Sequence, residues 1–233
     1  MNNANIIMHN GWRVDFSWTI DLYKGTYLRS VRNLVELLLT SPLRPRITFV
    51  SSVSSVQEWT AVFPDRPVAE APLESYEVAS PFGYGLSKHV AERVLARASE
   101  VSGTPVTILP VGQVAGPTDP NNGGGIWSTD EWIPSVAAIS KTLRLIPADI
   151  PPIDWLPVDL AARAIIELAL IGSNVDSVSE NQSPLRVFNV VNPTLSDWSL
   201  FARALQSRLD RNLGEGEICC RLLPLTEWVD ALR

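Results

Sequence analysis

Short apolar runs alternate along the first half of the chain with longer stretches in which apolar residues recur every three or four positions. The runs at 5–8, 47–51 and 106–109 are rich in β-branched residues, as is typical of strands buried in a parallel sheet. The stretches at 22–39 and 84–102 have the period of a helix. Strand, helix and strand in this order predict an α/β fold with a doubly wound, Rossmann-like parallel sheet.

The second half of the chain carries the same patterns at wider spacing. It is expected to form helices at 132–143, 158–171 and 196–209 and a late strand at 188–191. A loop rich in Pro, Gly and Asn at 116–125 separates the two halves. We therefore divide the chain into a truncated Rossmann-like core at 1–115 and a small substrate-binding lobe with returning sheet elements at 116–233.

Charge and composition exclude several classes of function. The 233 residues carry a formal net charge of −6, and the scattered basic residues argue against a nucleic-acid surface. The longest apolar runs are too short to span a bilayer, and the first residues lack the basic start of a signal peptide. We therefore expect a cytoplasmic protein that binds neither nucleic acid nor membrane.

No metal site or hydrolytic site is indicated. His9 and His89 have no metal-ligand partners at a suitable spacing, and His89 is expected to be solvated or at the edge of the core. The adjacent cysteines, Cys219 and Cys220, have no second pair with which to form a site. A Ser-His-Asp order and a paired carboxylate motif are both missing from the sequence.

Tyr84 and Lys88 lie four residues apart at the start of the second predicted helix, so they share one face of it, one turn apart. A cation beside a phenol lowers the pKa of the phenol, and such a tyrosine can donate or accept a proton near neutral pH. The second predicted strand ends in hydroxyl side chains, which it would deliver to the same site. The hydroxyl could come from Ser51, Ser52 or Ser54.

These residues belong to a series of short segments that occur in the order found in one known family. The segments are 9–16, 51–54, 84–88, 111–116, 131–135, 154–159 and 189–193. They cover nearly the whole chain, which on this basis resembles the extended short-chain dehydrogenase/reductases. Within that family it is most similar to the thioester reductase domains that release products from fungal peptide and polyketide synthases.

The resemblance implies a role for each matched residue. Tyr84 would be the catalytic acid/base, Lys88 its electrostatic partner and a ligand of the nicotinamide ribose, and Ser52 a hydrogen-bond donor to the reacting carbonyl oxygen. Four further residues would approach a nicotinamide cofactor if one binds: His9, Asn10, Gly112 and Gln113. Pro110 stands where the family usually has an arginine, which removes a charge near the site.

A second set of residues is implied to contact the substrate: Trp12, Ser54, Trp127, Trp132 and Trp155. The chain has eight Trp against four Tyr, and a pocket lined by tryptophan would suit an apolar acyl or indole-like substrate. Packing in the core is the alternative for each of these tryptophans.

The sequence shows no Gly-rich turn between a strand and a helix, the structure that binds a dinucleotide pyrophosphate. Gly123, Gly124 and Gly125 fall in a loop far from such a position. In the resembled family the phosphate loop precedes the segment at 9–16, so we expect that part to be missing here. We therefore favour an enzyme of secondary metabolism without a cofactor, which cyclises or isomerises a polyketide- or peptide-derived product.

Two alternatives stay open. One is the reaction of the family, NADPH-dependent reductive release of a carrier-bound thioester as an aldehyde or alcohol, with the missing part supplied by another chain or a longer gene product. The other is a non-catalytic scaffold or gene fragment. Because a sheet without its first strands exposes an edge, we also predict a homodimer.

Overall fold

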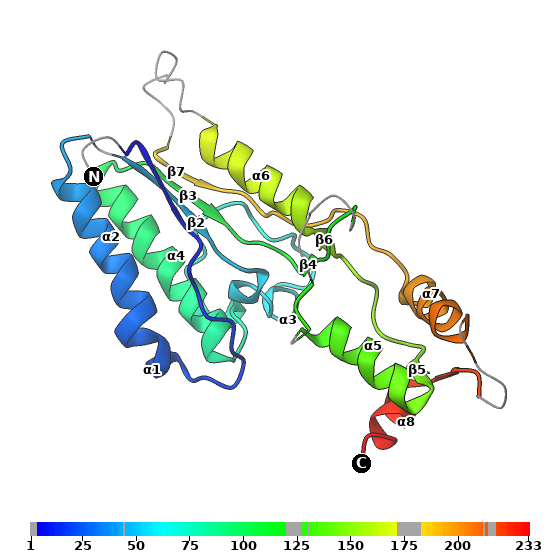
Figure 1. Ribbon diagram of the computed structural model, residues 1–233. Coiled ribbons are helices and arrows are strands. Elements are labelled where there is room, and N and C mark those ends of the chain that lie inside the picture. Colours follow the sequence, from blue (N-terminus) through cyan, green and yellow to red (C-terminus); the bar gives the residue numbers. More distant parts are fainter. Residues whose placement is uncertain are drawn as a thin grey trace. The chain divides into compact units, whose positions relative to one another are not determined.

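The computed structural model describes residues 4–43, 45–119, 127–129, 131–171, 183–211, 213 and 218–233 (Figure 1). The chain folds into two compact units. Unit 1 comprises Met1–Gln113 and Leu160–Val191, and unit 2 comprises Val114–Asp159 and Asn192–Arg233. Each unit has its own hydrophobic core.

Unit 1 is built on a parallel sheet. In the described ranges its strands are β1 (Ile6–His9), β2 (Arg46–Val50), β3 (Val106–Leu109) and β7 (Leu185–Val187). They lie in the order β1-β2-β3-β7, with Ile47 paired to Val106 and Val106 to Leu185. The α/β fold with a parallel sheet that the sequence predicts is confirmed.

Helices cover both faces of this sheet. The described helices of unit 1 are α1 (Ile20–Tyr23), a π-helical turn (Lys24–Leu28), α2 (Arg29–Thr40), α3 (Trp59–Val62), α4 (Gly83–Ser102) and α6 (Val158–Leu170). Short 3-10 turns lie at Val53–Ser55 and Tyr76–Val78. Helices α2 and α4 pack on one face. Arg46 and Arg186 point to the other face, where each donates a 2.8 Å hydrogen bond to the carbonyl of Ile171, just after α6.

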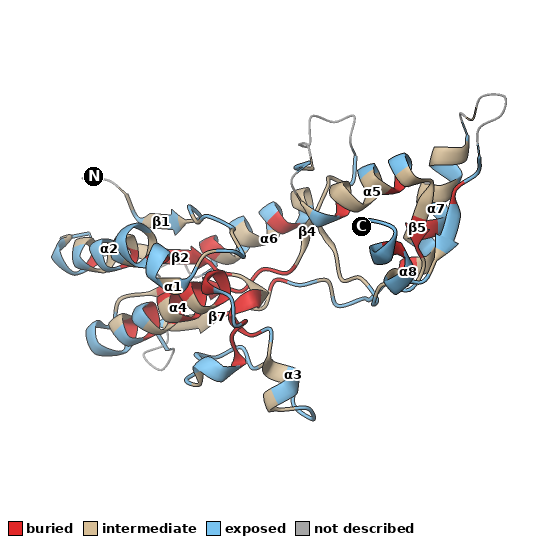
Figure 2. Ribbon diagram, turned by 90° about the horizontal axis from the view of Figure 1, so that it is seen from below, coloured by how far each residue is buried: buried red, intermediate tan, exposed pale blue. Residues whose placement is uncertain are grey.

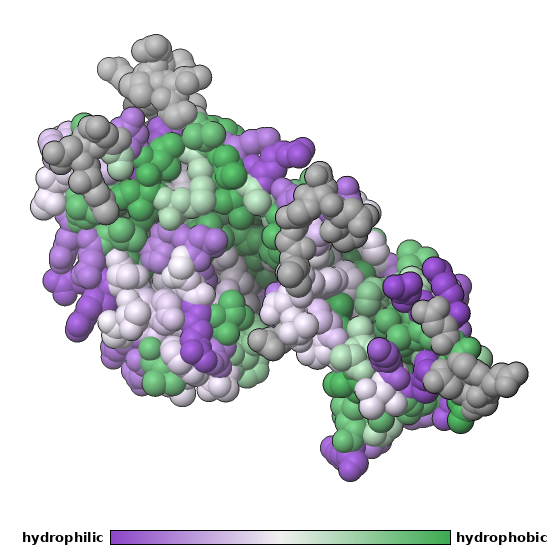
Figure 3. Space-filling view, in the orientation of Figure 1, coloured by the Kyte–Doolittle hydropathy of each residue, from purple (hydrophilic) through white to green (hydrophobic). Residues whose placement is uncertain are grey.

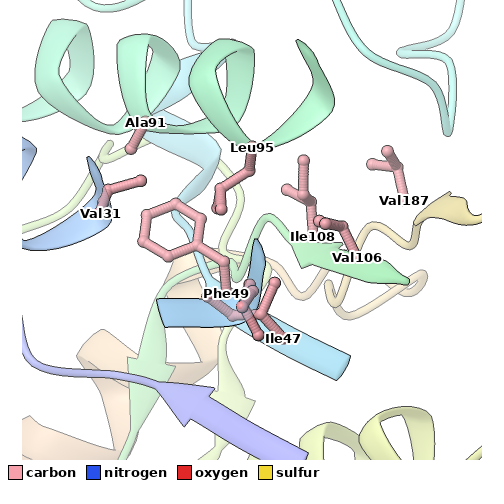
Figure 4. Packing of buried hydrophobic residues seen from close by; sticks show 9 residues of the cluster. Val31, Ile47, Phe49, Ala91, Leu95, Val106, Ile108 and Val187 are labelled. Atoms are coloured by element: carbon pink, nitrogen blue, oxygen red, sulfur yellow. The ribbon is translucent and has the colours of Figure 1, made fainter. Parts of the chain in front are cut away.

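The core of unit 1 lies between the sheet and the α2–α4 pair. Phe49 and Ile108 project from neighbouring strands toward Ala91 and Leu95 of α4, with Val31 of α2 beside them (Figure 4). Figure 2 shows buried residues concentrated along α4 and the strands that it covers. Helix α4 is therefore held in place by apolar contacts with the sheet and with α2.

The strand predicted at 188–191 is not found there, because β7 ends at Val187. The N–H of Val190 still donates to the carbonyl of Pro110 at 2.9 Å. Pro110 has no N–H, so it cannot donate a hydrogen bond to the neighbouring strand. The regular ladder is broken there, and an isolated bridge between Val111 and Val190 follows.

Unit 2 is smaller and is described here by itself. Its elements are β4 (Val114–Ala115), α5 (Trp132–Leu143), β5 (Leu145–Pro147), β6 (Leu156–Pro157), α7 (Trp198–Asp210), β8 (Arg221–Leu223) and α8 (Leu225–Asp230). Strand β4 pairs with β6 and strand β5 with β8. Asp197 caps α7 by accepting a hydrogen bond from the N–H of Ser199.

The exposed side of α6 carries apolar side chains beside the exposed Arg163 and Glu167. Leu160, Ile166 and Leu170 are each 42–51% exposed, and Ile171 follows them at the end of the helix. Figure 3 shows hydrophobic side chains gathered over this part of unit 1. Among the helices described, none is both long and apolar enough to cross a bilayer.

The sheet–helix core gives a direct test of the fold. Leu95 is fully buried beneath α4, whereas Val101 on the same helix is 69% exposed. Leu95→Ala should lower the free energy of unfolding by about 2–5 kcal/mol, because it leaves a cavity. Val101→Ala, the matched control, should change it by less than about 0.5 kcal/mol. Urea unfolding followed by Trp fluorescence measures both, and equal effects would contradict this packing.

Candidate active site

Helix α4 carries the candidate catalytic residues Tyr84 and Lys88. Tyr84, Lys88 and Glu92 follow one another at four-residue intervals and form one stripe along the helix. All three residues are buried, with 8%, 3% and 8% of their surface exposed. The stripe faces the carboxyl end of β2, where the chain continues as Ser51 and Ser52.

The structure brings Ser52 to Tyr84. The Ser52 side chain accepts a 3.2 Å hydrogen bond from the N–H of Ser54 and also hydrogen-bonds the Tyr84 side chain. Burial raises the pKa of Tyr84, and the bond to Ser52 only partly offsets this. The expectation that Lys88 lowers the pKa of Tyr84 is therefore wrong. The ammonium of Lys88 lies 6.0 Å from the Tyr84 ring centroid and is bonded elsewhere.

Lys88 is held by the backbone and by aromatic rings. Its Nζ donates a 2.7 Å hydrogen bond to the carbonyl of Val50. The same atom lies 4.7 Å from the centroid of the Trp12 ring and 4.8 Å from that of Phe49, within cation–π range. Burial lowers the pKa of Lys88 to about 7, although the charge of Glu92 opposes the shift. Lys88 thus exists in both protonation states near neutral pH.

Glu92 completes the stripe, and our reading of the sequence missed it. Ser51 Oγ donates a short hydrogen bond to Glu92 Oε1, and Ser55 also hydrogen-bonds the carboxylate. Burial raises the pKa of Glu92 to about 7, against these hydrogen bonds and the charge of Lys88. The four-residue spacing from Lys88 is the signal that could have identified it.

Two glycines allow α4 to come this close to its neighbours. A Cβ on Gly85 would lie 2.5 Å from the carbonyl oxygen of Ser54 and 2.6 Å from Cβ of Ser80. A Cβ on Gly83 would lie 2.3 Å from the carbonyl oxygen of Trp18. The first turn of α4 is therefore in backbone contact with the turn that carries Ser52.

The residues predicted to approach a cofactor lie at the ends of β1 and β3. His9 ends β1, where its Nε2 lies 3.2 Å from Ser30 Oγ. Burial and the charge of Lys88 both lower the pKa of His9, while the adjacent Asn10 is exposed. Gly112 is buried and donates its N–H to the carbonyl of Val190 at 2.9 Å. Carboxyl ends of parallel strands meet at one edge of a sheet, so these positions share the edge that carries Ser52.

The residues predicted to contact substrate divide between the two units. In unit 1, the ring of Trp12 lies beside the Lys88 ammonium, and its Nε1 donates a 3.1 Å hydrogen bond to Ser87 Oγ. Ser54 is buried, and its carbonyl accepts from the N–H of Ser80 at 2.8 Å. In unit 2, the three other predicted tryptophans belong to one aromatic cluster with Trp198 and Phe201. They are Trp127, Trp132 and Trp155. Their roles in substrate binding stay predictions.

A large pocket on the described part of unit 1 lies away from these residues. Its volume is about 960 Å³, and it is lined by the loop at 70–74, by the second half of α4 and by residues 183–188. Arg93 and Arg97 in its wall are paired with Glu74 and Glu100. Across the described ranges, no group of three or more His, Cys, Asp or Glu is placed to hold a metal ion.

Comparison with known families decides the identity of the fold. The model of an NAD-binding family described as male sterility protein matches residues 1–165. The chain belongs to this family. The resemblance to reductase domains that the sequence suggests is thereby confirmed.

Several curated relatives of this male sterility family member are named as reductases. A carboxylic acid reductase of Neurospora crassa is 33% identical over 235 residues, which cover 100% of this chain and 21% of that protein. An adenylate-forming reductase of Heterobasidion annosum is 31% identical over 229 residues, covering 97% of this chain and 18% of that protein. The chain thus spans about a fifth of the length of these relatives.

Solved structures show the same fold. The terminal R domain from the myxalamid PKS-NRPS biosynthetic pathway has a TM-score of 0.73 and 25% identity, over 97% of this chain and 51% of that one. A thiolation-reductase di-domain from an archaeal non-ribosomal peptide synthetase has a TM-score of 0.70 and 17% identity, over 98% and 45%. Neither the family nor these relatives support our expectation of an enzyme without a cofactor.

Gly85 provides a test of the contact between α4 and the serine turn. Gly85→Ala should lower the free energy of unfolding by about 1–3 kcal/mol, because its Cβ would overlap backbone that cannot move freely. Gly25→Ala is the control, because a Cβ there meets nothing within 4 Å. Urea unfolding measures both variants. If Gly85→Ala is as stable as the native protein, α4 does not approach the turn this closely.

The raised pKa of Glu92 makes stability depend on pH. Between pH 4.5 and about 7 the folded protein retains a proton on Glu92 that the unfolded chain releases. This residue therefore lowers the free energy of unfolding as pH rises through that window. Glu92→Gln cannot titrate, so its stability relative to the native protein should increase from pH 5 to pH 7. Urea unfolding at the two pH values measures the difference, and a constant difference would contradict the burial of a neutral carboxyl.

Proposed function

We propose that this chain carries the proton-transfer site of an NADPH-dependent reductase that releases a carrier-bound thioester as an aldehyde or alcohol. The observation that carries the proposal is the buried Tyr84, hydrogen-bonded to Ser52 beside Lys88, in a member of an NAD-binding family. The names of the Neurospora and Heterobasidion relatives also indicate reduction. These names favour reductive release over the cyclisation or isomerisation that we first expected.

The site suits a reaction in which negative charge develops on a carbonyl oxygen. Ser52 and Tyr84 present two hydroxyls that can donate hydrogen bonds to one such oxygen. The pKa of Tyr84 is raised by burial, so the phenol keeps its proton at neutral pH and can donate it as the charge develops. Lys88, one turn further along α4, is not among the groups that shift the pKa of Tyr84, so the role we propose for it is to hold the cofactor.

The residues at this edge of the sheet fit the nicotinamide end of the cofactor. NADPH, when bound, supplies the hydride. Lys88 and Tyr84 would hold its ribose, and the backbone around Gly112, where an added Cβ would meet Val191 at 3.3 Å, would border the ring. His9 and Asn10 follow β1 at the same edge.

The substrate class is inferred from the aromatic residues and from the relatives. Trp132 is 42% exposed at the edge of the aromatic cluster of unit 2, and such a surface favours an apolar acyl chain. The archaeal neighbour joins a thiolation domain to its reductase, which supports a thioester on a carrier protein as the partner. The homodimer and the cytoplasmic location expected from the sequence stay predictions.

Tyr84→Phe should reduce the rate of thioester reduction by on the order of 10²-fold or more, because the phenylalanine has no proton to donate. Tyr76→Phe changes a tyrosine that is 70% exposed and should leave the rate unchanged. Loss of NADPH absorbance with an acyl thioester of pantetheine measures the rate, and trapping with a hydrazine identifies the aldehyde. Absence of NADPH binding and of aldehyde with the native protein would overturn the proposal.

A further inference from the structure

The stripe on α4 contains a buried acid that the proposed reaction does not use. Among the described residues, Lys88 and Glu92 are the two Lys, Arg, Asp or Glu side chains that are buried. Removing a carboxylate from water is costly unless hydrogen bonds or an opposite charge compensate. Glu92 has both kinds of compensation, from Ser51 and Ser55 and from Lys88.

The two charges are anchored to consecutive residues of the same strand end. Lys88 donates to the carbonyl of Val50, and Glu92 accepts from the side chain of Ser51. The next residue is Ser52, which hydrogen-bonds Tyr84. A change at Glu92 would therefore act on Lys88 through its charge and on Ser52 through the strand.

We propose that Glu92 is a positioning residue of this site, a counter-charge that favours the protonated form of Lys88, and that Ser51 holds the Glu92 carboxylate at the end of β2. The proposal depends on the proposed function only for the use that the enzyme makes of Lys88. The contacts of Glu92 do not depend on the reaction.

Among the described groups that face Lys88, Glu92 is the source of negative charge. Lys88 is faced by the Trp12 and Phe49 rings, by the ring of Tyr84 and by His9 of β1. Glu92 is faced by Ser51 and Ser55, and the carbonyl of Ser55 also bonds His89 Nδ1. Burial lowers the pKa of both histidines and so favours their neutral form, and an imidazole side chain is either neutral or positive, so neither provides negative charge. Without Glu92, Lys88 would keep its burial and lose its counter-charge.

The chain is well suited to a direct measurement, because its lysines are Lys24, Lys88 and Lys141. Labelling lysine with ¹³C at Cε gives one NMR signal for each, and Lys24→Arg and Lys141→Arg identify the other two. In the native protein the Lys88 signal should titrate near pH 7. In Glu92→Gln it should titrate at a pH roughly 1 lower, because an opposite charge has been removed from a buried site.

Three further variants separate charge from structure. Glu100→Gln alters an exposed acid on the same helix that pairs with Arg97, and it should leave the Lys88 signal unchanged. Glu92→Asp keeps the charge and should restore part of the shift. Ser51→Ala removes a bond that lowers the pKa of Glu92, so it should move Lys88 in the same direction as Glu92→Gln but less. It also serves as the test if Glu92→Gln does not fold.

The outcomes distinguish this inference from the proposed function. A Lys88 midpoint that is the same in folded Glu92→Gln, or in Ser51→Ala, as in the native protein would overturn the role of Glu92, whatever the catalytic activity. A shifted midpoint supports it even if no thioester is reduced. Where reduction is observed, the alkaline limb of the pH profile of kcat/KM should move to lower pH in Glu92→Gln and stay in place in Glu100→Gln.

Discussion

The close approach of α4 to the end of β2 is the constraint on which the rest of the site depends. Gly85 brings the helix backbone against the carbonyl of Ser54, and the apolar core beneath α4 holds it there. At this distance Tyr84, Lys88 and Glu92 are shielded from water, so each needs a polar partner within the protein. The strand end supplies all three partners: Ser52, the carbonyl of Val50, and Ser51.

Burial, more than attraction between neighbouring charges, sets the protonation states in this site. For Tyr84 and Lys88 it is the largest cause of the shift, and in both it favours the neutral form. The sequence suggests the opposite for Tyr84, because the spacing of the two residues shows their proximity and not their loss of solvent. The outcome suits a proton donor, since a tyrosine that is easily ionised would have given up the proton that reduction requires.

The sequence predicts what depends on local pattern and fails where distant segments decide. The strands at 47–51 and 106–109 and the helix at 84–102 are found within a residue or two of their predicted ends. The helix predicted at 22–39 is interrupted by a π-helical turn at Lys24–Leu28, which no apolar period reveals. Glu92 was missed because a glutamate on a helix is ordinarily exposed. Its burial follows from the contact between α4 and β2. We expected no cofactor because the Gly-rich phosphate-binding motif is missing from the sequence, whereas the family match depends on residues that are present.

The buried Lys88–Glu92 pair is better explained by function than by stability. Taking two charges out of water has a cost that their attraction rarely exceeds, and apolar replacements of similar volume are often neutral or stabilising. The pKa of each is displaced toward neutrality, so the folded state disfavours the charged form of both residues. A fold that needed only a tight contact between α4 and β2 would be served by leucine or methionine at these positions. The pair instead places adjustable charge one and two turns from Tyr84, beside the site of the proposed proton transfer.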